Sequence, residues 1–300
     1  MTVNTFHSGF VSIIGAPNVG KSTLLNTIIG EKVAIATHKP QTTRTRITGI
    51  KNLEKGQIIF IDTPGIHQAK SRLNKRMVET ALAALDDADC CVYVLSAVKK
   101  LTADDDIILR NINNITSPVV LVINKIDLIT REEILPIIDR LQHVHPFEDI
   151  VPLSALKSVN VADLVDTLVT KLPPGPPLFP DDIFTESSER FLAAEMIREK
   201  IILLTHQEIP YATAVTIDSF HEDPDRAILT IQATINVEKK AQKGIVIGKG
   251  GAMLKKIGTQ SRRDMELFFK TKIFLKLFVR HTDKWSEKSA WLDEFGYMDK

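Results

Sequence analysis

The stretch Gly15-Ala16-Pro17-Asn18-Val19-Gly20-Lys21-Ser22 decides how the first half of this 300-residue chain folds. It stands between an apolar run at 10–14 and a helical pattern at 22–29. A strand, a glycine-rich turn ending in Gly-Lys-Ser and a helix form a phosphate-binding loop (P-loop), whose backbone N–H groups and helix N-terminus face phosphates. An ordinary glycine turn is the alternative, which so long a pattern disfavours. We expect Lys21 to reach the β- and γ-phosphates, Ser22 to ligate Mg2+ and Thr23 to complete the loop.

Residues 10–172 alternate short apolar runs with amphipathic stretches. The runs fall at 10–14, 57–61, 90–95, 119–123 and 150–153, and they are apolar nearly throughout. Strands covered on both faces show this pattern, and helical patterns separate the runs. The sequence therefore predicts a doubly wound α/β sheet with mostly parallel strands, in a first domain at 1–172.

The composition fits a folded protein, with 44% hydrophobic residues, 25% charged residues and a net charge of +1. This balance indicates no particular partner. No apolar run approaches the roughly 20 residues that a membrane-spanning helix needs, and the opening residues do not resemble a signal peptide. Cys90 and Cys91 are adjacent within an apolar run, so we interpret them as reduced core residues. These features predict a cytoplasmic protein.

A second motif, Asp62-Thr63-Pro64-Gly65, follows the run at 57–61. A carboxylate at this position holds Mg2+ through water, and the N–H of Gly65 donates to the γ-phosphate. A plain Pro-Gly turn is the alternative. We assign Ile66, which follows, to the same nucleotide-contacting segment.

Two further motifs point to guanine rather than adenine. Asn124-Lys125-Ile126-Asp127 follows the run at 119–123, and the Asp127 carboxylate matches the N1–H and the exocyclic amine of guanine. Ser154-Ala155-Leu156 follows the next run, and a backbone N–H there is suited to the guanine O6. Each of the four motifs lies at the carboxyl end of its own strand, the edge of an open α/β sheet where ligands bind. Together they predict a site for GTP.

The first domain resembles the branch of GTPases shared by the Era, TrmE and Der families. The resemblance rests on the wording of the P-loop and on Lys39-Pro40-Gln41-Thr42-Thr43-Arg44, which is similar to the family's switch I. It implies that Thr42 or Thr43 closes on Mg2+, and we favour Thr43 slightly. The apolar Ile66 cannot orient the attacking water, so either the protein hydrolyses GTP slowly or another group does this work. The resemblance implies that a potassium ion near Asn18 supplies positive charge there; the equal alternative is that Asn18 only shapes the turn.

The second half of the chain is organised differently. Residues 173–182 are rich in proline, which excludes helix and central strand, so we interpret them as an extended interdomain linker. The patterns at 183–300 run α-β-β-α-α-β. A Gly-x-x-Gly break, Gly248-Lys249-Gly250-Gly251, separates the second and third helical patterns, as in a type II KH domain, whose loop clamps the nucleic-acid backbone. The sequence therefore predicts an α+β KH domain with a C-terminal tail.

The KH-like segment is strongly basic. Residues 239–280 hold twelve basic and two acidic residues, a net charge of +10 in a chain of +1. This charge predicts a polyanionic partner, and with the loop it favours single-stranded RNA over duplex DNA. A solvated lysine-rich helix face is the alternative. The aromatic residues Phe268, Phe269, Phe274 and Phe278 could stack on bases, but at strand and helix spacing we expect them in the core. The predicted RNA contacts are Ile247, Gly248, Lys249, Gly250, Gly251, Lys255, Lys256, Arg262 and Arg263.

One GTPase domain followed by a KH domain is similar to the arrangement of the Era family of ribosome-assembly GTPases. The resemblance covers nearly the whole chain. It implies hydrolysis of GTP with Mg2+, binding of the 3′ end of small-subunit ribosomal RNA, a role in 30S subunit assembly, a monomer, and peripheral contact with the cell membrane. The rival interpretation is a nucleotide-gated signalling switch whose basic domain binds transfer RNA, membrane lipid or a protein.

Overall fold

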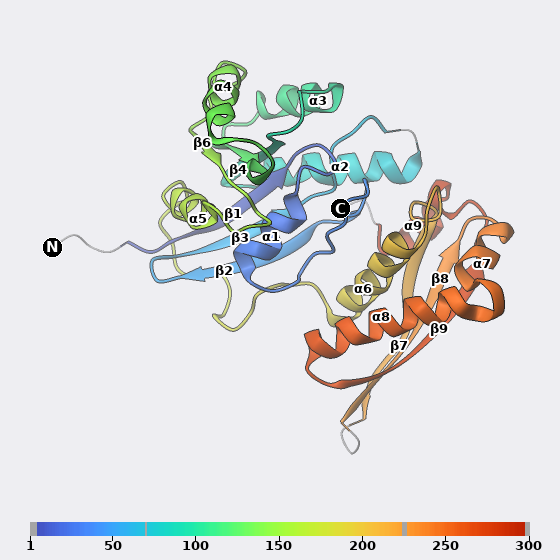
Figure 1. The fold of residues 1–300 in the computed structure, drawn as a ribbon. Coiled ribbons are helices and arrows are strands. Elements are labelled where there is room, and N and C mark those ends of the chain that lie inside the picture. The colour runs from blue at the N-terminus through green and yellow to red at the C-terminus, as the bar shows by residue number, and fades with distance from the viewer. Residues whose placement is uncertain (1–4, 70, 224–226, 298–300) are drawn as a thin grey trace. The chain divides into compact units, whose positions relative to one another are not determined.

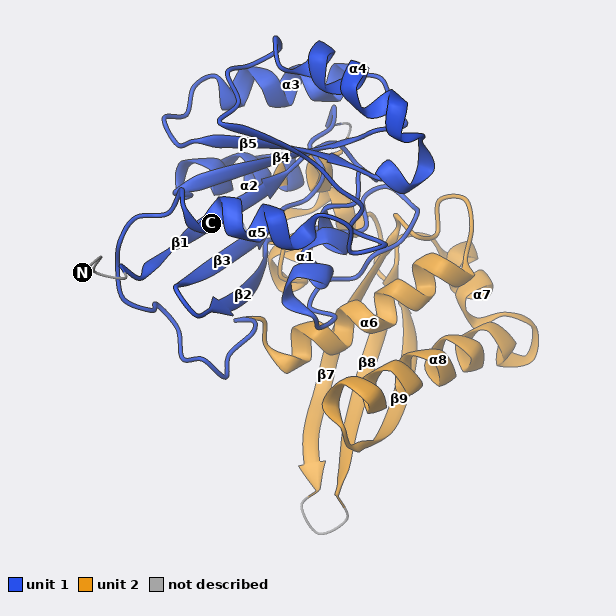
Figure 2. Cartoon of the chain, turned by 60° about the vertical axis from the view of Figure 1, so that its left-hand side comes forward, with its two compact units in different colours: residues 1–70, 77–186 blue, residues 71–76, 187–300 orange. Residues whose placement is uncertain are grey.

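The computed structural model describes residues 5–69, 71–223 and 227–297, and it divides the chain into two compact units. The first comprises residues 1–70 and 77–186, and the second comprises 71–76 and 187–300 (Figure 2). The two-part organisation is the one predicted, although residues 173–186 belong with the first unit. In the second half of the chain, the second strand pattern of the sequence covers 226–235, and its first residue, Arg226, lies outside the described residues.

The first unit is a doubly wound sheet, as predicted. Within the described residues its strand order is β2-β3-β1-β4-β5-β6, and all neighbours are parallel except β2 with β3. The elements are β1 (His7–Ile14), α1 (Lys21–Ile29), β2 (Ile47–Leu53), β3 (Gly56–Asp62), α2 (Arg72–Asp86), β4 (Cys90–Ser96), α3 (Ala103–Ile112), β5 (Val119–Asn124), a 3-10 turn (Ile126–Leu128), α4 (Arg131–Leu141), β6 (Asp149–Pro152) and α5 (Val161–Val169) (Figure 1).

Helices cover both faces of this sheet, which explains its uninterrupted apolar strands. Every residue of β3, β4 and β5 is buried. Leu85 of α2, Ile108 of α3 and Leu141 of α4 pack against Tyr93 and Leu121 on one face. Helices α1 and α5 contact each other and β3 on the opposite face (Figure 2). This layering places the carboxyl ends of the central strands together at one edge, where the predicted motifs follow.

The proline-rich segment is bound along the sheet edge rather than free. Gln57 of β3 is fully buried; its Oε1 accepts hydrogen bonds from the N–H groups of Leu178 (2.7 Å) and Phe179 (2.9 Å). Farther along, Ile50 of β2 donates its N–H to the carbonyl of Phe184 (2.9 Å). The segment thus satisfies backbone groups of β2 that an edge strand would otherwise expose.

The second unit has the predicted α-β-β-α-α-β order. Its described strands form a sheet in the order β7-β8-β9, with β7–β8 antiparallel and β8–β9 parallel. Helices α6 and α8 lie across one face of this sheet (Figure 1). The elements are α6 (Glu189–Leu204), β7 (Thr213–Asp223), β8 (Ile228–Val237), α7 (Lys240–Ile247), a 3-10 turn (Lys249–Gly251), α8 (Ala252–Phe269), β9 (Lys272–His281), a second 3-10 turn (Trp285–Glu287) and α9 (Ser289–Glu294).

The four phenylalanines expected in this core divide into two pairs. Phe268 and Phe269, at the end of α8, pack against the buried cluster, as predicted. Phe274 and Phe278 are 58% and 43% exposed, so the core prediction is wrong for these two. They occupy even positions of β9, whereas the odd positions face the helices. Among the described residues, no helix is long and apolar enough to cross a membrane.

Candidate functional site

The predicted P-loop joins β1 to α1, and its conformation requires glycine. Gly20 has a φ of 105° and directly precedes Lys21, the first residue of α1. A Cβ on Gly20 would lie 2.3 Å from Nδ2 of Asn124, and a Cβ on Gly15 would lie 2.5 Å from the carbonyl oxygen of Val94. The loop backbone lies so close to neighbouring residues that no side chain fits at either position, and both positions therefore require glycine. The positive end of α1 faces this loop, which suits an anion.

Lys21 is held inside the loop. It is 6% exposed, and its ammonium donates hydrogen bonds to the carbonyl oxygens of Gly15 (3.0 Å) and Ala16 (3.2 Å). Burial lowers the pKa of Lys21 to about 8, and the Asp62 carboxylate opposes this shift. The carbonyl oxygens carry only partial negative charges. A phosphate in the loop would supply the full negative charge that the Lys21 ammonium lacks there.

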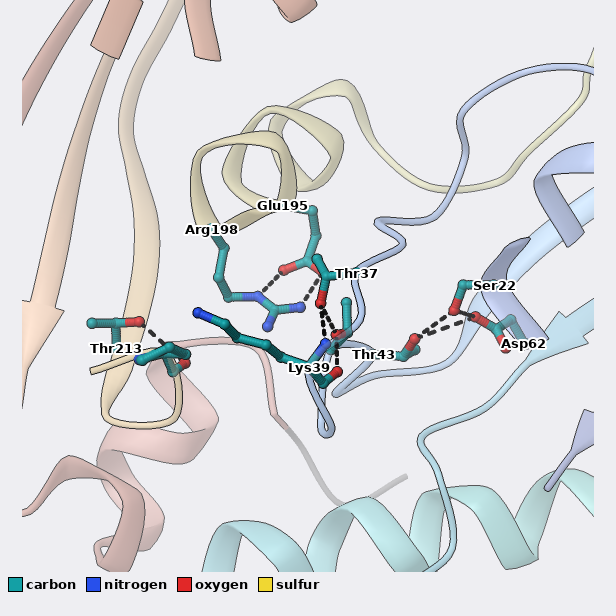
Figure 3. A network of polar contacts seen from close by, with 10 residues as sticks. Ser22, Thr37, Lys39, Thr43, Asp62, Glu195, Arg198 and Thr213 are labelled. Atoms are coloured by element: carbon teal, nitrogen blue, oxygen red, sulfur yellow. Dashed lines mark hydrogen bonds and ion pairs between the residues drawn. The ribbon is translucent and has the colours of Figure 1, made fainter. Parts of the chain in front are cut away.

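Three oxygen-bearing side chains meet beside the loop (Figure 3). The hydroxyl of Ser22 donates to Oδ2 of Asp62 (2.6 Å) and lies 2.8 Å from Oγ1 of Thr43. The Thr43 hydroxyl also donates to Oδ2 of Asp62 at 3.4 Å. Ser22 comes from α1, Asp62 from the end of β3 and Thr43 from the loop before β2, so three separate segments converge here.

Asp62 has the properties of a metal ligand. It is fully buried, and burial raises its pKa to about 6, opposed by Lys21 and by hydrogen bonds from Ser22, Thr43 and Thr63. Its Oδ1 is buried and has no hydrogen-bond partner within the described part of the chain. Carboxylate and hydroxyl oxygens are the ligands that Mg2+ prefers. These residues therefore fit the predicted Mg2+ site.

Thr42 and Thr43 are adjacent but differ in their partners. The hydroxyl of Thr42 donates to the carbonyl of Lys39 (2.8 Å) and contacts Oγ1 of Thr37 (2.7 Å), within its own loop. The Thr43 hydroxyl faces Ser22 and Asp62. The geometry therefore favours Thr43 as the threonine that closes on the metal.

We expect Thr43→Ala to lower the apparent affinity for Mg2+ in the presence of a GTP analogue by about tenfold, because one oxygen near the metal is lost. Thr42→Ala is the matched control and is expected to change this affinity less than threefold. Titration of Mg2+ against a fluorescent GTP analogue measures both variants. A larger loss in Thr42→Ala than in Thr43→Ala would contradict the assignment.

A pocket surrounds these groups and contains most of the predicted phosphate-side residues. It also contains Gln41 of the motif that resembles switch I, and three residues just before that motif, Ile35, Ala36 and Thr37, which the sequence motifs did not single out. The lining residues are Pro17, Asn18, Gly20, Lys21, Ser22, Thr23, Ile35, Ala36, Thr37, Gln41, Thr42, Thr43 and Gly65.

The side chains of Thr63, Pro64 and Ile66, in a segment predicted to contact the nucleotide, are buried in the protein. Ile66 is 0% exposed within the core cluster, and its N–H donates to the carbonyl of Gly15 at 3.3 Å. Thr63 donates its hydroxyl to the carbonyl of Ile13 (2.8 Å), and Pro64 is buried. These residues hold Gly65 against the loop, where a Cβ on Gly65 would lie 3.0 Å from Pro17.

The predicted guanine motifs converge through Asn124, the last residue of β5. Its Nδ2 donates to the carbonyl of Val19 (2.9 Å), and its Oδ1 accepts from the N–H groups of Lys125 (2.7 Å) and Ala155 (3.0 Å). The Ala155 N–H is therefore engaged by Asn124 here. Lys125 in turn donates its ammonium to the carbonyl of Asn18 (2.7 Å). Asn124 thus ties the P-loop to both guanine motifs.

Asp127 lies next to this junction with its carboxylate accessible. The hydroxyl of Ser154 donates to Oδ1 of Asp127 at 2.5 Å and fixes its orientation. Asp127 is exposed, so the carboxylate is available to a base. The Leu156 side chain is 73% exposed and takes no part in this arrangement.

In the second unit, the Gly-x-x-Gly loop joins α7 to α8 and is open to approach. Gly250 and Gly251 have φ values of 60° and 79°, and a Cβ on either would meet no atom within 4 Å. Gly248 is enclosed, since its Cβ would lie 2.8 Å from the backbone nitrogen of Met253. The N-terminus of α8 begins at Ala252, directly after the loop. A phosphate can therefore approach both the bare backbone and the positive helix end.

Basic side chains continue from this loop along α8. Arg262 follows Lys255 by seven positions, and Arg263 follows Lys256 by seven, so each pair shares a helix face. All four are exposed, as is Lys249. Arg262 lies 3.8 Å from Glu266, an exposed pair that contributes little to stability. Ile247 is half-buried at the end of α7. The basic residues among the predicted RNA contacts are thus all accessible, and the four on α8 make up a basic surface of that helix.

Two family models match the chain, one for each unit. The model described as a 50S ribosome-binding GTPase matches residues 10–125. The model described as a KH domain matches residues 208–286. The order agrees with the prediction of a GTPase domain followed by a KH domain.

Similar proteins share both halves. GTPase Era of Syntrophus aciditrophicus is 54% identical over 98% of this chain and 96% of its own length. GTPase Era of Geotalea uraniireducens is 54% identical over 99% of this chain and its whole length. A crystal structure of Aquifex aeolicus Era bound to GDP and AlF4− is 40% identical and covers 98% of this chain and all of its own, with a TM-score of 0.94. A crystal structure of Era with MgGDPNP and nucleotides 1506–1542 of 16S ribosomal RNA has the same coverage, 41% identity and a TM-score of 0.95. The chain belongs to the Era family of GTPases.

Proposed function

We propose that this GTPase is a switch that binds the 3′ end of small-subunit ribosomal RNA and acts in assembly of the 30S subunit. The observation that carries the proposal is the similarity, over 98% of the chain, to an Era structure that holds both a GTP analogue and a 16S RNA fragment. The open Gly-x-x-Gly loop and the basic surface on α8 supply the contacts that such an RNA needs.

The residues around the P-loop would bind the phosphates of the nucleotide and Mg2+. Lys21 neutralises the β- and γ-phosphates, and the N–H of Gly65 donates to the γ-phosphate. Ser22 and Thr43 would ligate Mg2+, and the Asp62 carboxylate, whose Oδ2 accepts hydrogen bonds from both hydroxyls, would hold it through water. Bound Mg2+ neutralises charge that develops on the phosphate oxygens. Asp127 selects guanine, because its carboxylate accepts two hydrogen bonds that adenine cannot donate.

The residue after Gly65 does not orient the attacking water, because the Ile66 side chain is apolar and buried in the core. We propose that a potassium ion beside Asn18 supplies charge to the transition state. Asn18 lines the pocket, but its φ of 65° also fits a residue that shapes the turn. A single variant separates the two roles, because glycine adopts this φ and lacks the amide oxygen.

We expect hydrolysis by the unaltered protein to fall about tenfold when Na+ replaces K+, which corresponds to about 1.4 kcal/mol in the barrier. In Asn18→Gly, the rates in the two salts are expected to be equal. Phosphate release at matched ionic strength measures both. If Asn18→Gly keeps the full preference for K+, the side chain does not hold the ion, and its role is in the turn.

Contacts of β2 connect the nucleotide pocket to residues 184 and 185, in the segment between the two units. Thr43 lies four residues before β2, whose Ile50 binds the carbonyl of Phe184. Thr185 also donates its hydroxyl to the carbonyl of Thr48 at 2.6 Å. Ordering of residues 36–48 and 62–75 around the γ-phosphate and Mg2+ would therefore act on the joining segment through β2.

The proposal is tested by binding RNA of nucleotides 1506–1542 to the protein loaded with GDP or with a non-hydrolysable GTP analogue, at fixed salt. We expect selective binding relative to a scrambled RNA and tighter binding with the analogue, with reciprocal tightening of the analogue by RNA. Equal affinity for both RNAs would leave the GTPase in place and assign the basic surface to another anionic partner.

We further propose that the protein works in the cytoplasm as a monomer that contacts the membrane periphery. The basic surface on α8 supports attraction to anionic lipid. Sedimentation with anionic vesicles tests the contact, and analytical ultracentrifugation tests the oligomeric state.

A further inference from the structure

The outer face of strand β9 carries alternating aromatic and basic side chains. Successive strand residues point to opposite faces, so Phe274, Lys276, Phe278 and Arg280 share one face. The odd residues, including Ile273 and Leu277, pack against the core on the helix side. The even residues therefore project away from α6 and α8.

These side chains are accessible. Phe274 is 58% exposed and Phe278 is 43% exposed. Lys276 lies between them, with its ammonium 5.0 Å from the centroid of the Phe278 ring. Lys276 and Arg280 are both exposed. Two rings four residues apart on a strand lie about 13 Å from each other, which leaves room for a base on each ring and a cation between them.

Charge on this face is distributed unevenly. Beside β9, strand β8 presents the polar residues Thr230, Gln232 and Thr234, which pair with Phe274, Lys276 and Phe278. The acidic Asp218 lies beyond them on β7, where it accepts a hydrogen bond from Thr234 (2.7 Å). A polyanion would therefore be attracted to the β9 side of the face and repelled from the β7 side.

We propose that the outer face of β9 is a second binding surface for single-stranded RNA. Bases stack on Phe274 and Phe278, while Lys276 and Arg280 contact phosphates. The proposal rests on the proposed RNA-binding function and extends it beyond the Gly-x-x-Gly loop. Strand β9 is an edge strand of the described sheet and also packs against α7 and α8, which flank that loop. An RNA leaving the loop reaches this face by crossing one sheet edge.

The alternation of residues distinguishes RNA from a lipid surface. A membrane-binding face buries contiguous apolar groups in the acyl region. Here a cation separates the two rings, and polar β8 side chains flank them. Rings separated by donors are the arrangement that nucleic-acid stacking surfaces use.

The test compares the full-length protein with the double variant Phe274→Ala/Phe278→Ala. The probes are RNA of nucleotides 1506–1542 and a short RNA of about four nucleotides, which fills only the Gly-x-x-Gly groove. We expect the double variant to bind the long RNA at least tenfold more weakly and the short RNA within twofold of the unaltered protein. The double variant Phe274→Trp/Phe278→Trp keeps two aromatic rings and is expected to bind the long RNA with the affinity of the unaltered protein. Leu135→Ala removes another exposed apolar side chain (72%), on α4 of the first unit, and is the control.

The outcomes separate this inference from the proposed function. If the unaltered protein binds neither RNA, both fail. If it binds both RNAs and the double alanine variant keeps its affinity for the long one, the β9 surface alone is overturned. Loss of binding to anionic vesicles with unchanged RNA affinity also overturns it and assigns the rings to a membrane. Loss of long-RNA affinity that tryptophan does not restore overturns the stacking role.

Discussion

Lys21→Met is expected to lower the rate of GTP hydrolysis by about a thousandfold without unfolding the protein. Removing one preorganised electrostatic contact to a developing charge costs about two to three orders of magnitude in other enzymes. Lys21 is placed for such a contact, because it is buried in the loop and its protein partners at hydrogen-bonding distance are the carbonyl oxygens of Gly15 and Ala16. Methionine keeps the length and the apolar stem of lysine.

The same variant is expected to make the nucleotide-free protein more stable. The pKa of Lys21 is about 8 in the folded chain, against 10.5 for a lysine in water, so the charged form is disfavoured on folding. Below pH 8 the full penalty applies, which corresponds to about 3 kcal/mol. Between pH 8 and 10.5 the unfolded chain binds more protons, so the stability of the unaltered protein rises with pH. The stabilisation by Lys21→Met is therefore largest near neutral pH and shrinks above pH 8.

Denaturant unfolding of both proteins at pH 7 and pH 10, together with phosphate release at saturating GTP, measures these effects. A variant that loses hydrolysis and stability together would indicate that Lys21 is structural. A variant that retains hydrolysis within tenfold would remove Lys21 from the reaction.

The sequence predicted the central strands of the first unit, because strands buried on both faces leave long apolar runs. It did not predict β2. That strand is at the sheet edge, and its burial falls from complete at Ile47 to partial at Leu53, so Ile47–Leu53 lacks a continuous apolar run. Its pairing with β3 depends on register, which a local pattern does not encode.

The sequence also did not predict where the proline-rich segment binds or that the rings of Phe274 and Phe278 are exposed, and the reason is related. Prolines at 173–180 correctly excluded helix, but the groups that bind this segment, such as the side chains of Ser8 and Gln57, lie more than a hundred residues away in the sequence. Phe274 and Phe278 were assigned to the core because aromatic residues in a strand usually pack. Helices α6 and α8 pack on only one face of the sheet that contains β9. The local sequence of β9 does not indicate which of its two faces they cover.

For the nucleotide pocket, the sequence predicted which segments converge but not which atoms meet. The motifs that contain Ser22 and Asp62 were each predicted to follow a strand at the ligand-binding edge of the sheet. The choice between Thr42 and Thr43 required the loop conformation, in which Thr42 turns back to Lys39. The buried, unpartnered Oδ1 of Asp62 is likewise visible only in three dimensions.

Gly250→Asp is expected to weaken binding of RNA of nucleotides 1506–1542 by about a hundredfold, or about 2.7 kcal/mol, and to leave GTP hydrolysis without RNA unchanged. A Cβ at Gly250 meets no atom within 4 Å, and aspartate tolerates a φ of 60°, so the fold accommodates the change. The carboxylate would stand beside the N-terminus of α8, where the RNA phosphate is proposed to bind. A negative charge there satisfies the helix end and repels the phosphate.

The matched control is Gly250→Asn, which has the same shape and backbone preference without the charge. If phosphate repulsion is the cause, asparagine should cost at least fivefold less affinity than aspartate, and higher salt should narrow the gap between them, because salt screens exposed charges. Equal losses would mean that any side chain blocks the backbone approach. Full RNA affinity in Gly250→Asp would move the RNA away from the Gly-x-x-Gly loop. Because the new carboxylate lies at a helix N-terminus, the melting temperature of Gly250→Asp should not fall, and this separates lost binding from lost structure.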